Sequence, residues 1–146
     1  MNHAELLAFI RRHRLAVVAS SAAGAPQAAV VGIAVTDELE LVFDTLGDTR
    51  KARNLRRDGR AAVVIGWDDE QTLQLEGDAD EPAGETLTRL QRCYFQAFPD
   101  GPTRLSWPGI TYFRIRPSWA RFSDFRPDSS RVIELSAAQL AAMPFT

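Results

Sequence analysis

The chain has 146 residues, of which 45% are hydrophobic and 25% charged, and its formal net charge is -2. This composition is typical of one soluble globular domain over residues 1–146, and the small net charge argues against a general nucleic-acid binder. No apolar run approaches the ~18 residues needed to cross a bilayer, so no membrane span is expected. Because Cys93 is the only cysteine and the first residues show no secretory pattern, we expect a cytoplasmic protein.

The residue inventory also limits the chemistry. The two histidines, His3 and His13, lie in or beside the first predicted helix, and no Cys/His cluster has the spacing of metal ligands. No Gly-x-Ser-x-Gly sequence is present. We therefore expect neither a metal site nor a hydrolytic triad, and the sequence identifies no catalytic acid or base. If the protein is an enzyme, a cofactor carries its reaction.

The predicted elements begin with a helix over 2–13, where Asn2 and Glu5 form a capping pattern and apolar residues share one face. Further along, strands are expected at 15–20, 27–35, 39–45, 60–67, 71–80 and in one or two pieces over 109–125, and helices at 49–57, 82–98 and 136–143. Consecutive hairpins interrupted by helices predict a β-rich α+β fold, with an antiparallel barrel or sandwich and helices alongside.

The stretch "FDTLGDTRKARNLRRDGR", residues 43–60, is the most informative one. Between residues 50 and 60 it holds six cations and one acid, Asp58. Arg50 and Lys51 fall in the first turn of the predicted helix, where unpaired backbone N–H groups are already positive.

Three explanations compete for these cations. A solvated basic face explains Arg53, Arg56 and Arg57, because cations are favourable near a helix C-terminus. Nucleic-acid binding would need a longer stripe interleaved with exposed aromatic residues, which this run lacks. A bound phosphate explains the first turn, because helix-start N–H groups, the Thr49 hydroxyl and two cations would all face one anion.

The same stretch, with the preceding "AAVVGIAVTDELELV", resembles the flavin-binding segment of the pyridoxamine 5′-phosphate oxidase-like, FMN-binding split-barrel family. The resemblance is strongest over residues 14–80. It implies an antiparallel six-stranded split β-barrel with flanking helices, which forms a homodimer with FMN at the interface.

The resemblance also implies a phosphate site. Thr49, Arg50 and Lys51 would hold the FMN phosphate, and Asp44 and Thr45 at the end of the preceding strand would contact the phosphate or the ribityl chain.

The ring site follows from the same resemblance. Val30 and Val31, with the neighbouring Gly32, would offer their backbone to the isoalloxazine ring. Either Gln71 or Thr72, at the start of a later strand, would face the ring.

The sequence also departs from the family pattern. Ala29 and Ala34 stand where the oxidase has an arginine and a lysine, and "SAAQLAAMPFT" lacks the oxidase's substrate-binding arginine and histidine. We therefore expect an FMN-dependent oxidoreductase acting on a small molecule other than pyridoxamine phosphate. The alternatives are a deazaflavin-dependent reductase of the same fold and a non-catalytic flavin-binding or storage protein.

Other residues have simpler interpretations. Trp107 and Trp119 are expected at the dimer interface. Arg114 and Arg116 share a strand face, and a solvated face is favoured over a role in guiding an anionic substrate. Cys93 is expected to be a packing residue.

Overall fold

The computed structural model describes residues 1–143. Its helical elements are α1 (His3–Arg12), α2 (Arg50–Arg57), α3 (Gly84–Ala97), the 3-10 helix η1 (Gly101–Ser106) and α4 (Ala137–Ala142). Its strands are β1 (Leu15–Ala22), β2 (Ala25–Gly32), β3 (Ala34–Val35), β4 (Leu41–Leu46), β5 (Arg60–Ile65), β6 (Gln71–Asp80), β7 (Ile110–Asp124) and β8 (Arg131–Leu135). No helix among residues 1–143 is long and apolar enough to cross a membrane.

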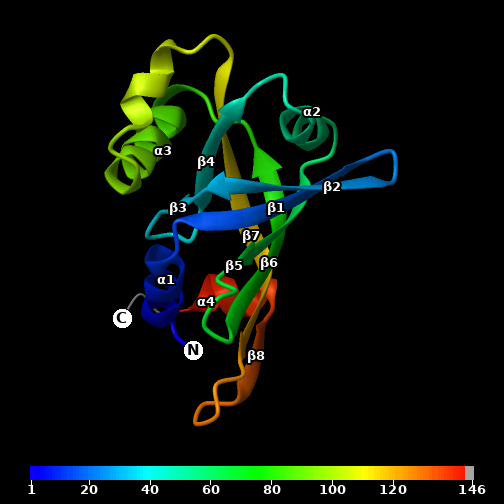
Figure 1. Cartoon of the computed structure of the whole chain (residues 1–146), viewed down its shortest axis with the longest axis vertical. Helices are drawn as coiled ribbons and strands as arrows, with labels where there is room; N and C mark the ends of the chain where they lie inside the picture. Colours follow the sequence, from blue (N-terminus) through cyan, green and yellow to red (C-terminus); the bar gives the residue numbers. More distant parts are fainter. Residues whose placement is uncertain (144–146) are drawn as a thin grey trace.

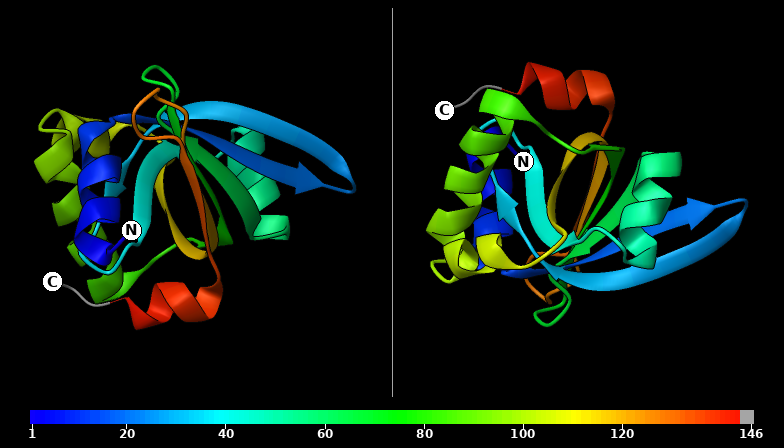
Figure 2. Two further views of the ribbon diagram at one scale, coloured as in Figure 1. Left: turned by 90° about the horizontal axis from the view of Figure 1, so that it is seen from below. Right: turned by 90° about the horizontal axis from the view of Figure 1, so that it is seen from above.

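All the strands join one curled antiparallel sheet in the order β2-β1-β5-β6-β7-β4-β3, with β8 paired to β7 (Figure 1). The two strands at the ends of this order, β2 and β3, are consecutive in the chain and are separated only by Ile33. The sheet therefore curls round until one segment of chain, 25–35, pairs at both of its ends. Figure 2 shows the resulting half-open barrel with helices alongside, which confirms the predicted split barrel.

The strand number differs from the predicted six for two reasons. The expected strand 27–35 breaks at Ile33 because its halves pair with different partners, β1 and β4. The strand β8 was not predicted, since its residues are all exposed or only partly buried and show no apolar alternation. The predicted strand or strands over 109–125 form one 15-residue strand, β7.

Helix starts follow the predicted capping chemistry. In α1, Asn2 accepts a hydrogen bond from the Glu5 backbone while Glu5 accepts one from Asn2, so a full capping box is formed. Ser136 and Gln139 form a second box at α4. The side chain of Thr49 caps α2.

The main core fills the barrel, and helices complete it. Phe9 of α1 meets Phe122 of β7 edge-on, with ring centroids 5.2 Å apart, and Ala52 and Leu55 of α2 belong to the same apolar cluster. A smaller core lies between α3 and the outer side of β4 and β7.

The smaller core covers the outer side of β4 and confirms one prediction. Leu41 and Phe43 belong to the barrel core, whereas Val42 points outward and is fully buried because Leu90 and Tyr94 of α3 cover it. Cys93 packs beside this core, as predicted, and burial raises the pKa of its thiol.

An ion-pair network links α3 to the barrel. Glu40 accepts hydrogen bonds from Arg89 of α3 at 2.8 Å and from Arg114 of β7 at 2.9 Å, and Arg114 also pairs with Asp80. The prediction of a solvated Arg114 is therefore wrong, because α3 and two acids enclose a side chain that is only 14% exposed. Arg116, which is 57% exposed, fits the prediction.

Acid should weaken this network. The Arg89 hydrogen bond is the main cause that lowers the pKa of Glu40 from 4.5 to about 2. A lowered folded-state pKa stabilises the fold above the unfolded value and is lost as pH falls through the folded one. Glu40→Gln should therefore reduce the free energy of unfolding at pH 7 by about 1–3 kcal/mol. In urea melts this difference should shrink below about pH 4.5 and vanish near pH 2.

Glu134→Gln is the control for Glu40→Gln, because Glu134 is 57% exposed and lies 3.7 Å from Arg121. It should have little effect at any pH. A Glu40→Gln effect that persists unchanged at pH 2 would show that charge is not its cause.

Gly66 gives a second test of the fold. It has φ +73°, and an added Cβ would lie 2.7 Å from Cζ of Phe9 and 2.9 Å from Nε2 of His13. Gly24 has φ +79° with nothing within 4 Å of an added Cβ. Both Ala variants should lose about 1–2 kcal/mol from the left-handed backbone, and Gly66→Ala about 1–3 kcal/mol more from overpacking. Equal urea midpoints for the two variants would contradict the packing of α1 onto this turn.

Candidate functional site

Three side chains converge where β4 ends and α2 begins. Nζ of Lys51 donates to Oγ1 of Thr45 at 2.9 Å, and the Thr45 and Thr49 hydroxyl oxygens are 3.2 Å apart. Because the Thr49 hydroxyl donates to the carbonyl of Leu46, Thr45 is the donor in the contact between the two hydroxyls. The structure thus brings together the Thr45, Thr49 and Lys51 that the sequence predicts.

Lys51 is unusual in its burial. It is only 8% exposed, it forms no ion pair with any of residues 1–143, and burial lowers its pKa. An ammonium has three donors, and within residues 1–143 the only hydrogen-bond acceptor of this one is the Thr45 hydroxyl. A buried charge is costly unless it is paired, so the site favours an incoming anion. The adjacent Arg50 is exposed and likewise forms no ion pair within the described chain.

The rest of α2 is held by its own side chains. Arg56 donates to the carbonyl of Gly47 at 2.6 Å and forms a bidentate pair with Glu81. Asn54 donates to Ser20 inside the barrel at 3.2 Å. These contacts fix the helix start that presents Lys51, and they show that Arg56 braces the turn rather than forming part of a solvated face.

Asp44 does not join this cluster. Its carboxylate accepts hydrogen bonds from the Tyr94 hydroxyl at 2.9 Å and from Nε of Arg104 at 2.7 Å, on the side of β4 that faces α3. Burial, and then the charge of Asp44, raise the pKa of Tyr94. No pattern in the sequence predicts Tyr94 or Arg104 in this role, because they lie 50 and 60 residues further along the chain.

The predicted ring residues lie on β2. The side chain of Val30 is 60% exposed on the outer face of the sheet, while Val31 points into the barrel and is 7% exposed. Gly32 is covered by Phe98, whose Cζ would lie 2.8 Å from an added Cβ. The missing side chain at Gly32 therefore makes room for an aromatic ring of the same chain.

The structure also separates Gln71 from Thr72. The Gln71 amide is buried and donates to Asp124 at 3.1 Å. Asp124 is 1% exposed, and Arg126 holds its pKa far below the usual range. Thr72 lies between two inward residues of β6 and is only partly buried on the outer face. Of the two candidates, Thr72 is the one whose side chain is free to face a ligand there.

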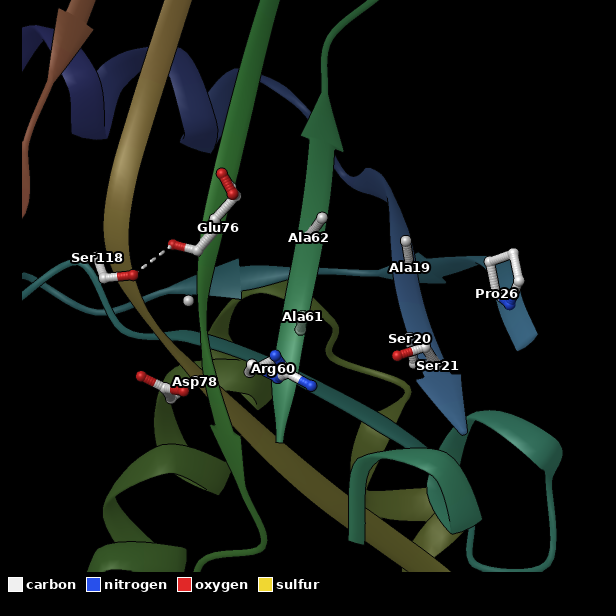
Figure 3. Close-up of a pocket in the computed structure, with 11 residues that line it drawn as sticks. Ala19, Ser20, Ser21, Pro26, Arg60, Ala61, Ala62, Glu76, Asp78 and Ser118 are labelled. Atoms are coloured by element: carbon white, nitrogen blue, oxygen red, sulfur yellow. Dashed lines mark hydrogen bonds between the residues drawn. The ribbon is translucent and has the colours of Figure 1, made fainter. Parts of the chain in front are cut away.

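The outer face of β1, β2, β5 and β6 carries a hollow of about 530 Å³ (Figure 3). Small side chains such as Ala19, Ala62 and Pro26 line it, with Arg60 and Asp78 at one end. Arg60 is already paired with Asp58 at 2.7 Å. The hollow therefore presents mainly an apolar surface. Within residues 1–143 no group of three or more His, Cys, Asp or Glu side chains is placed to hold a metal ion.

Large apolar side chains are exposed on the outer face of the sheet and in two of the turns that follow its strands. Leu15 and Val30 lie on β1 and β2, with exposed fractions of 50% and 60%. Trp67 and Phe125 lie in the turns that follow β5 and β7. Trp107 is 51% exposed and Trp119 partly so, so both are accessible to a partner.

Comparison with known proteins identifies the family. The sequence model described as "Pyridoxamine 5'-phosphate oxidase" matches residues 3–141. The chain belongs to the pyridoxamine 5′-phosphate oxidase family. A search of curated proteins gave no match.

Solved structures share the fold of this family member. A heme binding protein from Mycobacterium smegmatis superimposes with a TM-score of 0.81 at 19% identity, over 97% of this chain and 61% of that protein. A putative pyridoxamine 5′-phosphate oxidase from Listeria innocua gives 0.67 at 20% identity, over 82% and 96% of the two chains. General stress protein 26 from Bacillus anthracis str. Sterne gives 0.68 at 17%, over 91% and 98%. At these identities the likeness establishes the fold.

Proposed function

We propose that this protein binds FMN and acts as a flavin-dependent oxidoreductase on a small molecule. The single observation that carries the proposal is the buried ammonium of Lys51, which donates to the Thr45 hydroxyl and pairs with no carboxylate of residues 1–143. Membership of the pyridoxamine 5′-phosphate oxidase family supports flavin as the source of the anion.

A phosphate fits this site on three grounds. Thr49 caps α2 by accepting a hydrogen bond from the Ala52 backbone, which leaves the N–H groups of Arg50 and Lys51 facing one position at the helix start, beside the Thr49 side chain. Lys51 supplies a buried cation and Arg50 an exposed one. Each charge-assisted hydrogen bond contributes about 1.5–3 kcal/mol, which exceeds the ~0.3–1 kcal/mol that each cation costs at a helix N-terminus.

When bound, FMN would supply hydride-transfer chemistry. The chain's own part is to hold and orient the cofactor. Thr49, Arg50 and Lys51 bind its phosphate, and β2 offers backbone and the exposed Val30 to its ring, with Thr72 facing the same outer surface. Asp44 acts indirectly, because its bonds to Tyr94 and Arg104 fix the end of β4 beside Thr45.

The proposal includes a homodimer with the flavin at its interface. The strand β2 is an edge strand without a charged residue, and its outer face exposes Val30. Uncharged exposed edges are usually covered in soluble proteins. A second copy of this apolar face is the partner that fits best, since it buries the face against an equal surface.

The alternative cofactor is a deazaflavin. The alternative function is non-catalytic binding or storage of FMN. Haem is less well supported, because the two histidines both lie on or beside α1 and the His13 ring is tilted against Phe9 at 4.7 Å. The mass of the cofactor that co-purifies separates these ligands. Reduction of bound flavin by NAD(P)H, followed by reoxidation, would distinguish a catalyst from a store.

Lys51→Ala tests the phosphate site. This substitution should weaken the binding of FMN by roughly tenfold to over a hundredfold, because a charge-assisted contact is lost. Riboflavin, which has no phosphate, should be affected much less. Fluorescence titration of both ligands measures the two losses. Without ligand, the variant should be as stable as wild type or slightly more so, since a cation leaves a positive helix end.

Arg57→Ala is the matched control, as Arg57 is an exposed cation at the other end of α2. It should change neither affinity appreciably. If Lys51→Ala loses equal affinity for FMN and for riboflavin, the assignment of a phosphate site at Lys51 is wrong.

Val30→Asp tests the dimer. A charge on this face of both copies should weaken self-association by several kcal/mol, more than roughly a hundredfold. Ala8→Asp, on the exposed side of α1, is the control and should remain dimeric. Sedimentation velocity across a dilution series measures both. A wild-type protein that stays monomeric while it holds FMN would contradict the two-subunit site.

A further inference from the structure

Phe98, at the end of α3, packs against two other side chains. Its ring stacks on Tyr94 with centroids 4.8 Å apart, and the guanidinium carbon of Arg14 lies 4.8 Å from its centroid. The edge of the same ring points at Gly32, since Cζ and Cε1 would be 2.8 and 3.0 Å from an added Cβ. Phe98 thereby brings a cation to the end of β2.

Arg14 is held there by its backbone and its side chain. Its carbonyl accepts a hydrogen bond from the Ile33 backbone at 2.9 Å, at the break between β2 and β3. Its guanidinium donates to the carbonyl of Ala97 at 2.9 Å, and within residues 1–143 it forms no ion pair. The exposed guanidinium is therefore held by a carbonyl and an aromatic ring, while the nearby Asp100, whose pKa it helps to lower, forms its ion pair with Arg104.

These contacts form a corner with the outer face of the sheet. Along β2, Val30 is exposed on that face, and two residues later Gly32 is closed off by the Phe98 ring. A flat ring lying on the backbone at Val30 and Val31 would be limited at the Gly32 end by Phe98 and Arg14. The corner offers a planar apolar edge and one cation.

Resting on the proposed function, we propose that Arg14, held in place by Phe98, binds the flavin ring and stabilises its reduced form. Hydride transfer from a reduced nicotinamide, which would be oxidised in the same step, would add one proton and two electrons, and so one negative charge, to a bound neutral flavin. A fixed cation beside the ring stabilises that charge more than it stabilises the neutral oxidised ring. Arg14 is thus a cofactor-tuning residue.

A purely structural role for Arg14 has a different signature. A cation that only caps the C-terminus of α3 stabilises the helix end, and its loss affects the fold without distinguishing between the two redox forms of a ligand. The decisive quantity is therefore the ratio of the affinities for reduced and oxidised FMN, which is the shift in midpoint potential on binding.

The experiment compares wild type, Arg14→Gln, Arg14→Lys and Phe98→Leu, each loaded with FMN and checked for folding by circular dichroism. Arg14→Gln should lose about tenfold in its preference for reduced over oxidised FMN, a fall of about 30 mV in the two-electron midpoint potential. Phe98→Leu should also lower the midpoint potential, because the guanidinium of Arg14 loses the aromatic ring on which it packs. Arg14→Lys should retain most of the wild-type value because it keeps the charge.

Arg12→Gln is the matched control. Arg12 is an exposed neighbour whose guanidinium lies over Phe9 at 5.2 Å rather than over Phe98. The midpoint potential of FMN bound to Arg12→Gln should therefore equal that of FMN bound to wild type. An unchanged midpoint potential of FMN bound to Arg14→Gln would overturn this inference and leave the proposed function standing. Should Arg14→Gln not fold, Phe98→Leu provides the same test. If wild-type protein does not bind FMN, both are overturned.

Discussion

The segment from Ala25 to Val35 has to pair with two different strands, and most of the structure follows from this requirement. Residues of β2 pair with β1, and after a break at Ile33 the two residues of β3 pair with β4. The sheet can satisfy both pairings only by curling into a barrel. The break also creates the point where Arg14 and Phe98 meet the strand, through the Ile33 amide and the bare backbone of Gly32.

Charge placement then explains why α2 begins where it does. Lys51 and Arg50 occupy the positive end of a short helix, and Lys51 is buried as well. Both features cost stability in the empty protein. The helix tolerates them because Arg56, Asn54 and the Thr49 cap hold it independently. An anion at the helix start turns the same two cations into favourable contacts, which is the physical basis of the proposed FMN site.

Local patterns in the sequence were sufficient to predict the parts of the structure that depend on local chemistry. The Asn2–Glu5 box marks the start of α1 within a few residues, and the strands predicted at 60–67 and 71–80 are found as β5 and β6. The cations at the start of α2 pointed to the Thr49 and Lys51 part of the cluster, whereas Thr45 was expected only from the family resemblance, which also named Asp44 although Asp44 lies outside the cluster.

Features that depend on distant partners could not be predicted in this way. The carboxylate of Asp44 meets Tyr94 and Arg104, and the amide of Gln71 meets Asp124, 53 residues away. Arg114 is largely shielded from solvent, with 14% of its side chain exposed, because α3 contributes Arg89 to an acid that both arginines share. No period or motif in a single sequence specifies which helix covers which strand, so these side chains could be assigned only from the folded chain.

The central claim is that a phosphate sits against the buried ammonium of Lys51. Phosphorus-31 NMR of bound FMN tests it most directly, because a free phosphate monoester takes up a proton with a pKa near ~6. Beside Lys51 and Arg50 the phosphate should remain dianionic, so its resonance should stay constant as the pH falls from about 8 to 5, well below the usual transition. A bound resonance that titrates like free FMN would place the phosphate in solvent and contradict the account.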